Sequence, residues 1–226
     1  MKIKKVIGRS LLVLLCIAVV AALVGVAQFR HRSNPKNLKQ YHTDNPFITG
    51  ETAISAHRSG AGEFPEETLA AFRGCAENPQ LQVDYFEFDL HMTADNILVL
   101  SHDATLDRVS DAVTVFGAEN VLIRDRTLPE LKELNMAAQF VSAAGETPYA
   151  GLHGDAVPDE LRILSLDEVL DYLTSAGDYR YIIEIKDGGE AGLSAAEQLY
   201  TTLKARGLLD RVIVGSFRDE VADYIT

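Results

Sequence analysis

The chain begins with one long apolar run. Residues 10–29 carry no charge, four lysines or arginines precede them, and Arg30, His31 and Arg32 follow directly. About 20 apolar residues at a helical rise of about 1.5 Å span the roughly 30 Å hydrocarbon layer of a bilayer. The pattern therefore predicts a transmembrane signal anchor over residues 1–32.

A cleaved signal peptide is the alternative for this segment. Such peptides have a shorter apolar region and a small-residue cleavage site, for which Gly25–Ala27 is a poor match. Cations flank the run almost equally, so the positive-inside rule decides its orientation weakly. The cations that directly precede the helix favour a cytoplasmic N-terminus. We therefore expect a single-pass membrane protein whose body lies outside the cytoplasm.

After the apolar run, residues 33–50 are polar and contain Pro35 and Pro46, which is typical of a linker. The remaining residues, 51–226, predict one globular domain in which short β-prone runs alternate with amphipathic segments. Strands are predicted over residues 52–57, 85–90, 97–102, 179–186 and 211–217. Helices are predicted over 66–78 (opened by Pro65), 128–135, 165–176 and 195–206, and at the end of the chain.

Strands that alternate with helices pair in parallel and indicate an α/β fold. A closed (β/α)8 barrel has eight strands and typically about 250 residues. Because about five strands can be counted here, we expect a TIM-type (β/α)8 barrel that is C-terminally incomplete.

The net charge of −12 conceals an asymmetry, since residues 1–39 contain eight lysines or arginines and no acidic residue. The body is therefore strongly acidic. Nucleic acid is excluded as a partner on this ground, because phosphate backbones are bound by clustered cations. An acidic body suits either a divalent metal held among carboxylates or a soluble surface. The composition leaves both readings open.

Polar residues recur where the predicted strands end. Glu87 and Asp89 are two residues apart on one strand, so they share a face, and Glu184 and Lys186 repeat this spacing on a later strand. A carboxylate buried on a strand needs a compensating partner, which a hard cation such as Mg²⁺ or Ca²⁺ provides. An edge strand with a polar face, or a simple Glu–Lys ion pair, is the alternative.

Two histidines complete this set of polar residues. His57 and Arg58 end the first predicted strand, and His102 ends the third. Histidines beside a metal act as general acid and base near neutral pH, although a single histidine at a strand end is more often a surface residue.

Four segments together resemble the glycerophosphodiester phosphodiesterase family: HRSGAGEFPEETLAAF, FEFDLHMTADNILVLSHDATLDRVS, IIEIK and VIVGSF. The resemblance covers about residues 54–217. It implies a TIM barrel and metal-dependent hydrolysis of glycerophosphodiesters to glycerol 3-phosphate and an alcohol. By this resemblance Glu87, Asp89 and Glu184 are the metal ligands, for Mg²⁺ or Ca²⁺. The substrate would be a small-molecule or lipid-derived glycerophosphodiester.

The resemblance also implies roles for five other residues. His57 and His102 would be the acid/base pair, Arg58 and Lys186 would bind the substrate phosphate, and Glu66 would be a supporting residue. Whether water or the substrate's own glycerol hydroxyl attacks phosphorus stays open.

The chain departs from the family pattern at two positions and at its end. Ser59 stands where a glycine usually follows His-Arg, and Glu67 stands where an asparagine is usual, which adds negative charge. The family's last strands have no counterpart. A phospholipase D- or C-like lipid phosphodiesterase is one alternative, which would need a membrane-facing loop at 145–158. An inactive truncated barrel or binding module is another. The oligomeric state is undetermined.

Overall fold

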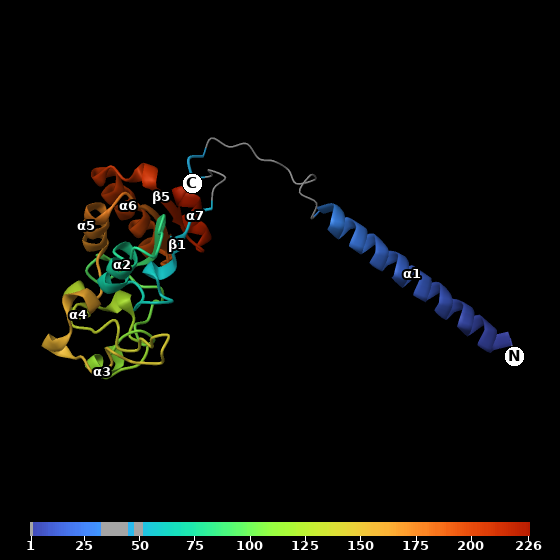
Figure 1. Cartoon of the computed structure of the whole chain (residues 1–226), viewed down its shortest axis with the longest axis horizontal. Helices are drawn as coiled ribbons and strands as arrows, with labels where there is room; N and C mark the ends of the chain where they lie inside the picture. Colours follow the sequence, from blue (N-terminus) through green and yellow to red (C-terminus); the bar gives the residue numbers. More distant parts are fainter. Residues whose placement is uncertain (1, 33–44, 48–51) are drawn as a thin grey trace. The chain divides into compact units, whose positions relative to one another are not determined.

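The structure, a computed structural model, describes residues 2–32, 45–47 and 52–226 (Figure 1). The chain divides into two compact units, Met1–Glu51 and Thr52–Thr226. Most of the predicted linker, residues 33–50, lies outside the described residues. Its boundaries stay a prediction.

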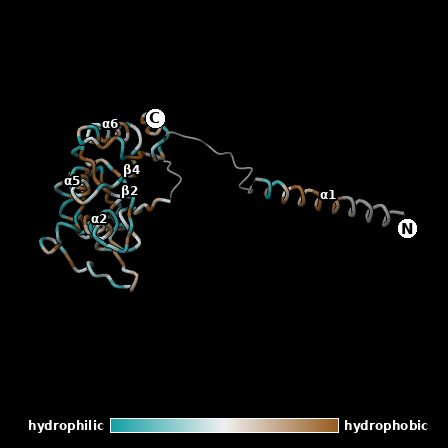
Figure 2. The backbone as a smooth tube through the Cα atoms, turned by 45° about the horizontal axis from the view of Figure 1, so that its top comes forward, coloured by the Kyte–Doolittle hydropathy of each residue, from teal (hydrophilic) through white to brown (hydrophobic). Residues whose placement is uncertain are grey.

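The first unit contains one long helix, α1 (Lys2–Arg32). Within it, Leu14–His31 is long and apolar enough to cross a membrane. Figure 2 shows this stretch as predominantly hydrophobic. A signal sequence near an N-terminus meets the same criterion. The helix is therefore a candidate membrane span, and the choice between anchor and signal stays a prediction.

The second unit is an α/β domain. Its strands are β1 (Ser55–Ala56), β2 (Tyr85–Met92), β3 (Leu98–Leu100), β4 (Arg180–Ile185) and β5 (Val212–Gly215). Its α-helices are α2 (Leu69–Ala76), α3 (Ala112–Phe116), α4 (Leu128–Leu131), α5 (Leu166–Ala176), α6 (Gly189–Arg206) and α7 (Asp219–Ile225). Short 3₁₀ turns are η2 (His57–Ser59), η3 (Ile123–Asp125), η4 (Gly154–Ala156), η5 (Asp159–Leu161) and η6 (Leu209–Arg211).

One sheet carries all five strands, in the order β1-β2-β4-β5, with β3 paired to β2. The pairs along this path are parallel, as the sequence predicts, but β3 pairs with β2 in the antiparallel sense. The prediction of parallel pairing was wrong for this strand. Only residues 93–97 separate β2 from β3, and so short a connection can join only antiparallel strands. Asn96, with φ of 61°, supplies the left-handed residue that this turn needs.

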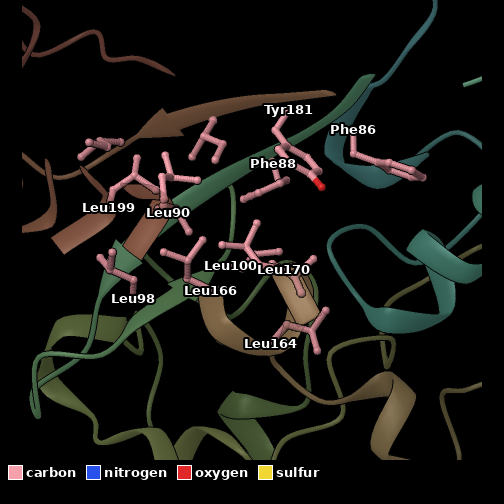
Figure 3. Packing of buried hydrophobic residues seen from close by; sticks show 14 of the residues in the cluster. Phe86, Phe88, Leu90, Leu98, Leu100, Leu164, Leu166, Leu170, Tyr181 and Leu199 are labelled. Carbon is pink, nitrogen blue, oxygen red and sulfur yellow. The ribbon is translucent and has the colours of Figure 1, made fainter. Parts of the chain in front are cut away.

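The core forms on one face of β2 and β4. Phe86, Phe88 and Leu90 alternate along β2 and are fully buried, together with Tyr181 and Ile183 of β4. They pack against leucines of α5 and α6 (Figure 3). Because side chains alternate across a strand, the odd-numbered residues of β2 must project from the opposite face. The core therefore determines which side of the sheet presents Glu87 and Asp89.

The helix predicted from Pro65 begins four residues later, at Leu69. Glu67 has φ of 56°, which ends any helix before it, and the Thr68 hydroxyl oxygen then caps α2 by accepting a hydrogen bond from Ala71 N at 3.3 Å. The prediction that Glu66 and Glu67 lie in the first helical turn was therefore wrong. Both residues belong to a loop, which leaves their side chains available to the site.

Candidate active site

The first site segment is the tight turn after β1. The predicted strand 52–57 ends at Ala56, and η2 follows, with φ of 46° at Arg58 and 62° at Ser59. These left-handed conformations turn the Arg58 backbone N–H towards β2, where it donates a hydrogen bond of 2.6 Å to Glu87 Oε2. His57 Nε2 lies 3.9 Å from the same oxygen. The turn therefore places a histidine and an arginine beside the first predicted metal ligand.

Beyond the end of β1, the loop that follows η2 lies along the edge of β2 through Glu67. Because β1 ends early, Asp89 N has no partner strand on this side, and it donates to Glu67 Oε1 at 2.7 Å. Glu67 is 4% exposed, and its Oε2 has no hydrogen-bond partner in the described part of the chain. Burial, reinforced by the charge of Asp89, raises the pKa of Glu67 well above its usual value. The sequence interpretation had noted the added charge of Glu67 without this structural role.

The second site segment is the paired stretch of β2 and β4. Asp89 and Glu184 are register partners, and Glu87 lies two residues before Asp89 on the same face. Lys186 Nζ lies 3.2 Å from Asp89 Oδ1 and 3.0 Å from Glu184 Oε1. Burial alone would lower the pKa of Lys186, but the hydrogen bond to Glu184 and the charge of Asp89 raise it. The ammonium group therefore stays charged and links the two strands.

These carboxylates have the chemistry of a hard-cation site. Asp89 is 1% exposed, yet neither of its carboxylate oxygens accepts a hydrogen bond of good geometry from the described residues. Burial raises the pKa of Glu87, and Asp89 contributes to the rise, as in a site that concentrates negative charge. No group of three or more such ligands converges on one point among the described residues. Glu87, Asp89 and Glu184 nevertheless share one face and fit a divalent cation by donor type.

A chain of charged groups connects His102 to Arg58. His102 Nδ1 is 2.7 Å from Asp103 Oδ1, and Asp103 Oδ2 accepts from Arg108 Nε at 2.5 Å. The Arg108 guanidinium donates two further bonds to Glu66, at 2.6 and 3.0 Å. Glu66 Oε1 lies 3.6 Å from Arg58 NH1. Burial would raise the pKa of Asp103, but the hydrogen bonds from Arg108 and His102 lower it.

Asp103 and Arg108 are site residues that the sequence interpretation left without a role. Both belong to the segment HDATLDR, which is part of the family resemblance. The signal was the acidic residue directly after His102, because a carboxylate beside a catalytic histidine commonly fixes its tautomer. The contact between Arg108 and Glu66 joins segments 42 residues apart, so no local pattern predicts it.

The loop at 145–158, on which the lipid-phosphodiesterase alternative depends, packs two of its large apolar side chains against a buried cluster. Tyr149 and Leu152 lie against the buried cluster of Ala137, Val157 and Leu161. Their carbonyl oxygens also accept hydrogen bonds from Asn135 Nδ2, at 2.8 and 3.0 Å. These two side chains are therefore part of a small core, whereas a membrane-facing loop would present them to lipid.

Comparison with known proteins gives a consistent result. Residues 57–221 match the sequence profile of the Glycerophosphoryl diester phosphodiesterase family. A glycerophosphodiester phosphodiesterase of Caldanaerobacter subterraneus is 30% identical over 74% of this chain and 58% of its own length. One of Bacillus subtilis is 29% identical over 73% of this chain and 52% of its own length. This chain therefore spans little more than half of the curated relatives that it matches.

A solved structure of an Oleispira antarctica phosphodiesterase, in complex with the product sn-glycerol-3-phosphate, has a TM-score of 0.58 and 21% identity. It is matched over 76% of this chain and 60% of that chain. This likeness establishes the fold, which in such neighbours is TIM-barrel-like. The sheet described above is parallel along β1-β2-β4-β5, as the strands of a TIM-type barrel are.

Proposed function

Because this chain belongs to the glycerophosphoryl diester phosphodiesterase family, we propose that it is a phosphoric diester hydrolase whose catalytic residues lie on β2, on β4 and in the segments beside them. The reaction is the hydrolysis of a glycerophosphodiester to glycerol 3-phosphate and an alcohol. The observation that carries the proposal is the single face of β2 and β4 on which Glu87, Asp89, Glu184 and Lys186 lie, with His57 beside Glu87.

The two histidines supply acid and base. His57 is 71% exposed at its side chain and His102 is 31% exposed, so both are accessible to a substrate and to protons from water. Asp103 holds His102 at Nδ1, which leaves Nε2 to exchange a proton with the reacting oxygen. One histidine removes a proton from the nucleophile while the other protonates the leaving alcohol.

The cationic side chains bind the phosphate. Arg58 has 22% of its side chain exposed and lies beside Glu66, which orients it. Lys186 lies at the end of β4 and carries its charge next to the carboxylates. Both stabilise negative charge on the phosphoryl oxygens as the transition state forms.

Glu87, Asp89 and Glu184 would hold a divalent metal, Mg²⁺ or Ca²⁺ by donor type. When bound, such a metal supplies Lewis-acid polarisation of the phosphate and lowers the pKa of a bound hydroxyl. The buried Asp89 carboxylate contacts Lys186 but accepts no hydrogen bond of good geometry from the described residues, which supports this assignment. So does Glu67, whose bond to Asp89 N fixes the position of that residue on β2.

The test is a coupled assay on the full chain in detergent. Purified protein is incubated with sn-glycero-3-phosphocholine, -ethanolamine and -glycerol in the presence of Mg²⁺ or Ca²⁺, and sn-glycerol 3-phosphate is measured by NADH formation with its dehydrogenase. We expect release of glycerol 3-phosphate from at least one diester, and its loss in the His57→Ala/His102→Ala double variant. No release from any of the three, by protein that unfolds cooperatively, would contradict the proposal.

We propose the location of the protein from α1 and the charges that flank it. The apolar stretch Leu14–His31 supports a membrane anchor with the hydrolase domain outside the cytoplasm. Substrates close to a membrane surface, such as diesters derived from lipids, would then be the accessible ones.

A further inference from the structure

A cavity of about 190 Å³ lies beside Lys186, at the ends of β4 and β5. Three of its lining side chains are cations that come from separate segments: Arg124 from η3, Lys186 from the end of β4, and Arg218 from the residues after β5. Neither the sequence-based predictions nor the proposed mechanism gives Arg124 or Arg218 a role. The volume far exceeds the roughly 15 Å³ of probe-occupied space that one water needs, and so accommodates a small polyatomic anion.

The acidic residue in the lining is already engaged. Asp187 Oδ1 is 2.8 Å from His91 Nδ1, and Asp187 Oδ2 accepts from Met92 N at 2.7 Å. Burial would raise the pKa of Asp187, but the contact with His91 lowers it, so the carboxylate stays ionised and bound to these two groups. Both of its oxygens are therefore already hydrogen-bonded, and Lys186 and the two arginines are the other charged side chains of the lining.

His91, on β2, also belongs to the lining of the cavity. The His91 side chain is 5% exposed, and its Nε2 has no hydrogen-bond partner in the part of the chain that the structure describes. A buried polar atom without a partner is destabilising, so the described residues do not satisfy every polar group of this side chain.

The arginines are positioned for recognition of an oxyanion. Arg218 Nε donates to Lys186 O at 3.2 Å, which ties this side chain to the end of β4. Arg124 Nε lies 3.9 Å from Asp125 Oδ1, and its side chain is 74% exposed. The N–H of Gly189 at the start of α6 is taken by Glu220 at 2.7 Å, so the guanidinium groups, and not the helix end, provide the attraction. Guanidinium groups match the geometry of phosphate oxygens.

We propose that this cavity is a second anion subsite, which binds a phosphate group on the alcohol portion of the substrate. The inference rests on the proposed function. Lys186 forms part of the cavity and also contacts Asp89 and Glu184, so the subsite adjoins the carboxylates assigned to the scissile phosphate. The glycerol portion leaves as glycerol 3-phosphate and carries no second phosphate. A second anion must therefore belong to the alcohol, and the preferred substrate class is a glycerophosphodiester whose alcohol is itself phosphorylated.

The experiment compares two substrates that differ by this phosphate alone: sn-glycero-3-phosphoglycerol and the same diester with a phosphate on its second glycerol. The full chain and its Arg124→Gln/Arg218→Gln variant are assayed at matched ionic strength. We expect the wild-type kcat/KM to favour the phosphorylated substrate at least tenfold, and the double variant to lose at least tenfold of that ratio. Arg73→Gln, at a half-exposed arginine outside the lining, is the matched control and keeps the wild-type ratio.

A binding measurement separates failure of the subsite from failure of the proposed function. Inorganic phosphate is titrated into wild type and both variants by calorimetry, and we expect at least tenfold weaker binding in Arg124→Gln/Arg218→Gln alone. Loss of binding without hydrolysis of any diester would support the subsite and contradict the proposed function. Hydrolysis with an unchanged ratio, or equal slowing of both substrates, would overturn the subsite. If the double variant unfolds early, the same criteria apply to Arg124→Gln, whose exposed side chain makes it structurally tolerant.

Discussion

Replacing Lys186 with methionine tests the electrostatics of the site without an activity measurement. Methionine keeps the length and apolar body of the side chain but removes the ammonium that lies 3.2 Å from Asp89 and 3.0 Å from Glu184. The side chains of these three residues are 14%, 1% and 19% exposed. The substitution therefore leaves the buried Asp89 and the partly buried Glu184 without their shared cation.

The magnitude follows from this burial. Breaking a buried ion pair by removing one partner costs about 3–5 kcal/mol, which is a large part of the roughly 5–15 kcal/mol that stabilises a typical domain. Lys132→Met is the matched control, because Lys132 pairs with Glu168 at 2.7 Å with 28% and 47% exposure. An exposed pair of this kind contributes at most about 1 kcal/mol. The difference between the two variants isolates burial as the cause.

Urea unfolding in EDTA, followed by near-ultraviolet circular dichroism of the tyrosines, gives both free energies of unfolding. The raised pKa of Lys186 means that its stabilisation is complete below the unfolded pKa of about 10.4 and is lost as the pH rises through the folded value. The deficit of Lys186→Met should therefore be constant from about pH 6 to 9 and shrink at higher pH. A loss no larger than that of Lys132→Met would refute this reasoning.

Divalent metal should restore part of the loss. A ligand at about 100 times its dissociation constant stabilises the folded state by about 2.7 kcal/mol. Lys186→Met should gain more from Mg²⁺ or Ca²⁺ than wild type does, because its carboxylates lack a competing ammonium. Equal gains in both proteins would contradict the assignment of Asp89 and Glu184 as metal ligands.

Four further outcomes are expected. His57→Ala and His102→Ala should each lower kcat by about 10² to 10⁴ while calorimetric metal binding is kept, and wild-type turnover in either variant would remove that residue from the mechanism. EDTA should abolish hydrolysis, and Mg²⁺ or Ca²⁺ should restore it; full activity after metal removal would disprove metal dependence. Arg108→Gln should lower kcat at least tenfold. It should lower the free energy of unfolding by only about 1 kcal/mol, because the Arg108 side chain is 47% exposed. A small loss in kcat as well as in stability would show that Arg108 makes only a surface contact. Residues 14–31 should retain the chain in membranes after an alkaline carbonate wash, and a mature N-terminus near Gln28 would indicate a cleaved signal.

Periodicity alone determined much of the architecture. The i, i+2 alternation of Phe86, Phe88 and Leu90 predicts a strand with one buried face, and therefore places Glu87 and Asp89 together on the other. The apolar run that corresponds to α1 is equally local, since length and composition suffice to identify it. The structure contains both the strand and the helix, because the backbone geometry of each element fixes the directions of its side chains.

The sequence interpretation was wrong where local signals competed. Pro65 is a favoured first residue of a helix, but the left-handed Glu67 delays the helix to Leu69. β-Propensity identified the strand at 97–102 but carries no information on its direction, which the short turn before Leu98 decides. In both cases a turn decided the outcome, which the periodic pattern around it does not encode.

What the sequence by itself determined is the set of chemical groups and the strand faces that present them. Only the tertiary structure decided their partners: Glu66 with Arg108, Glu67 with the N–H of Asp89, and Lys186 with two carboxylates. Such contacts join loops that are distant in the chain, and they depend on where each strand ends against its neighbour. Spacing along the sequence encodes a shared face, but it does not encode distance between elements, because packing of the core sets that distance.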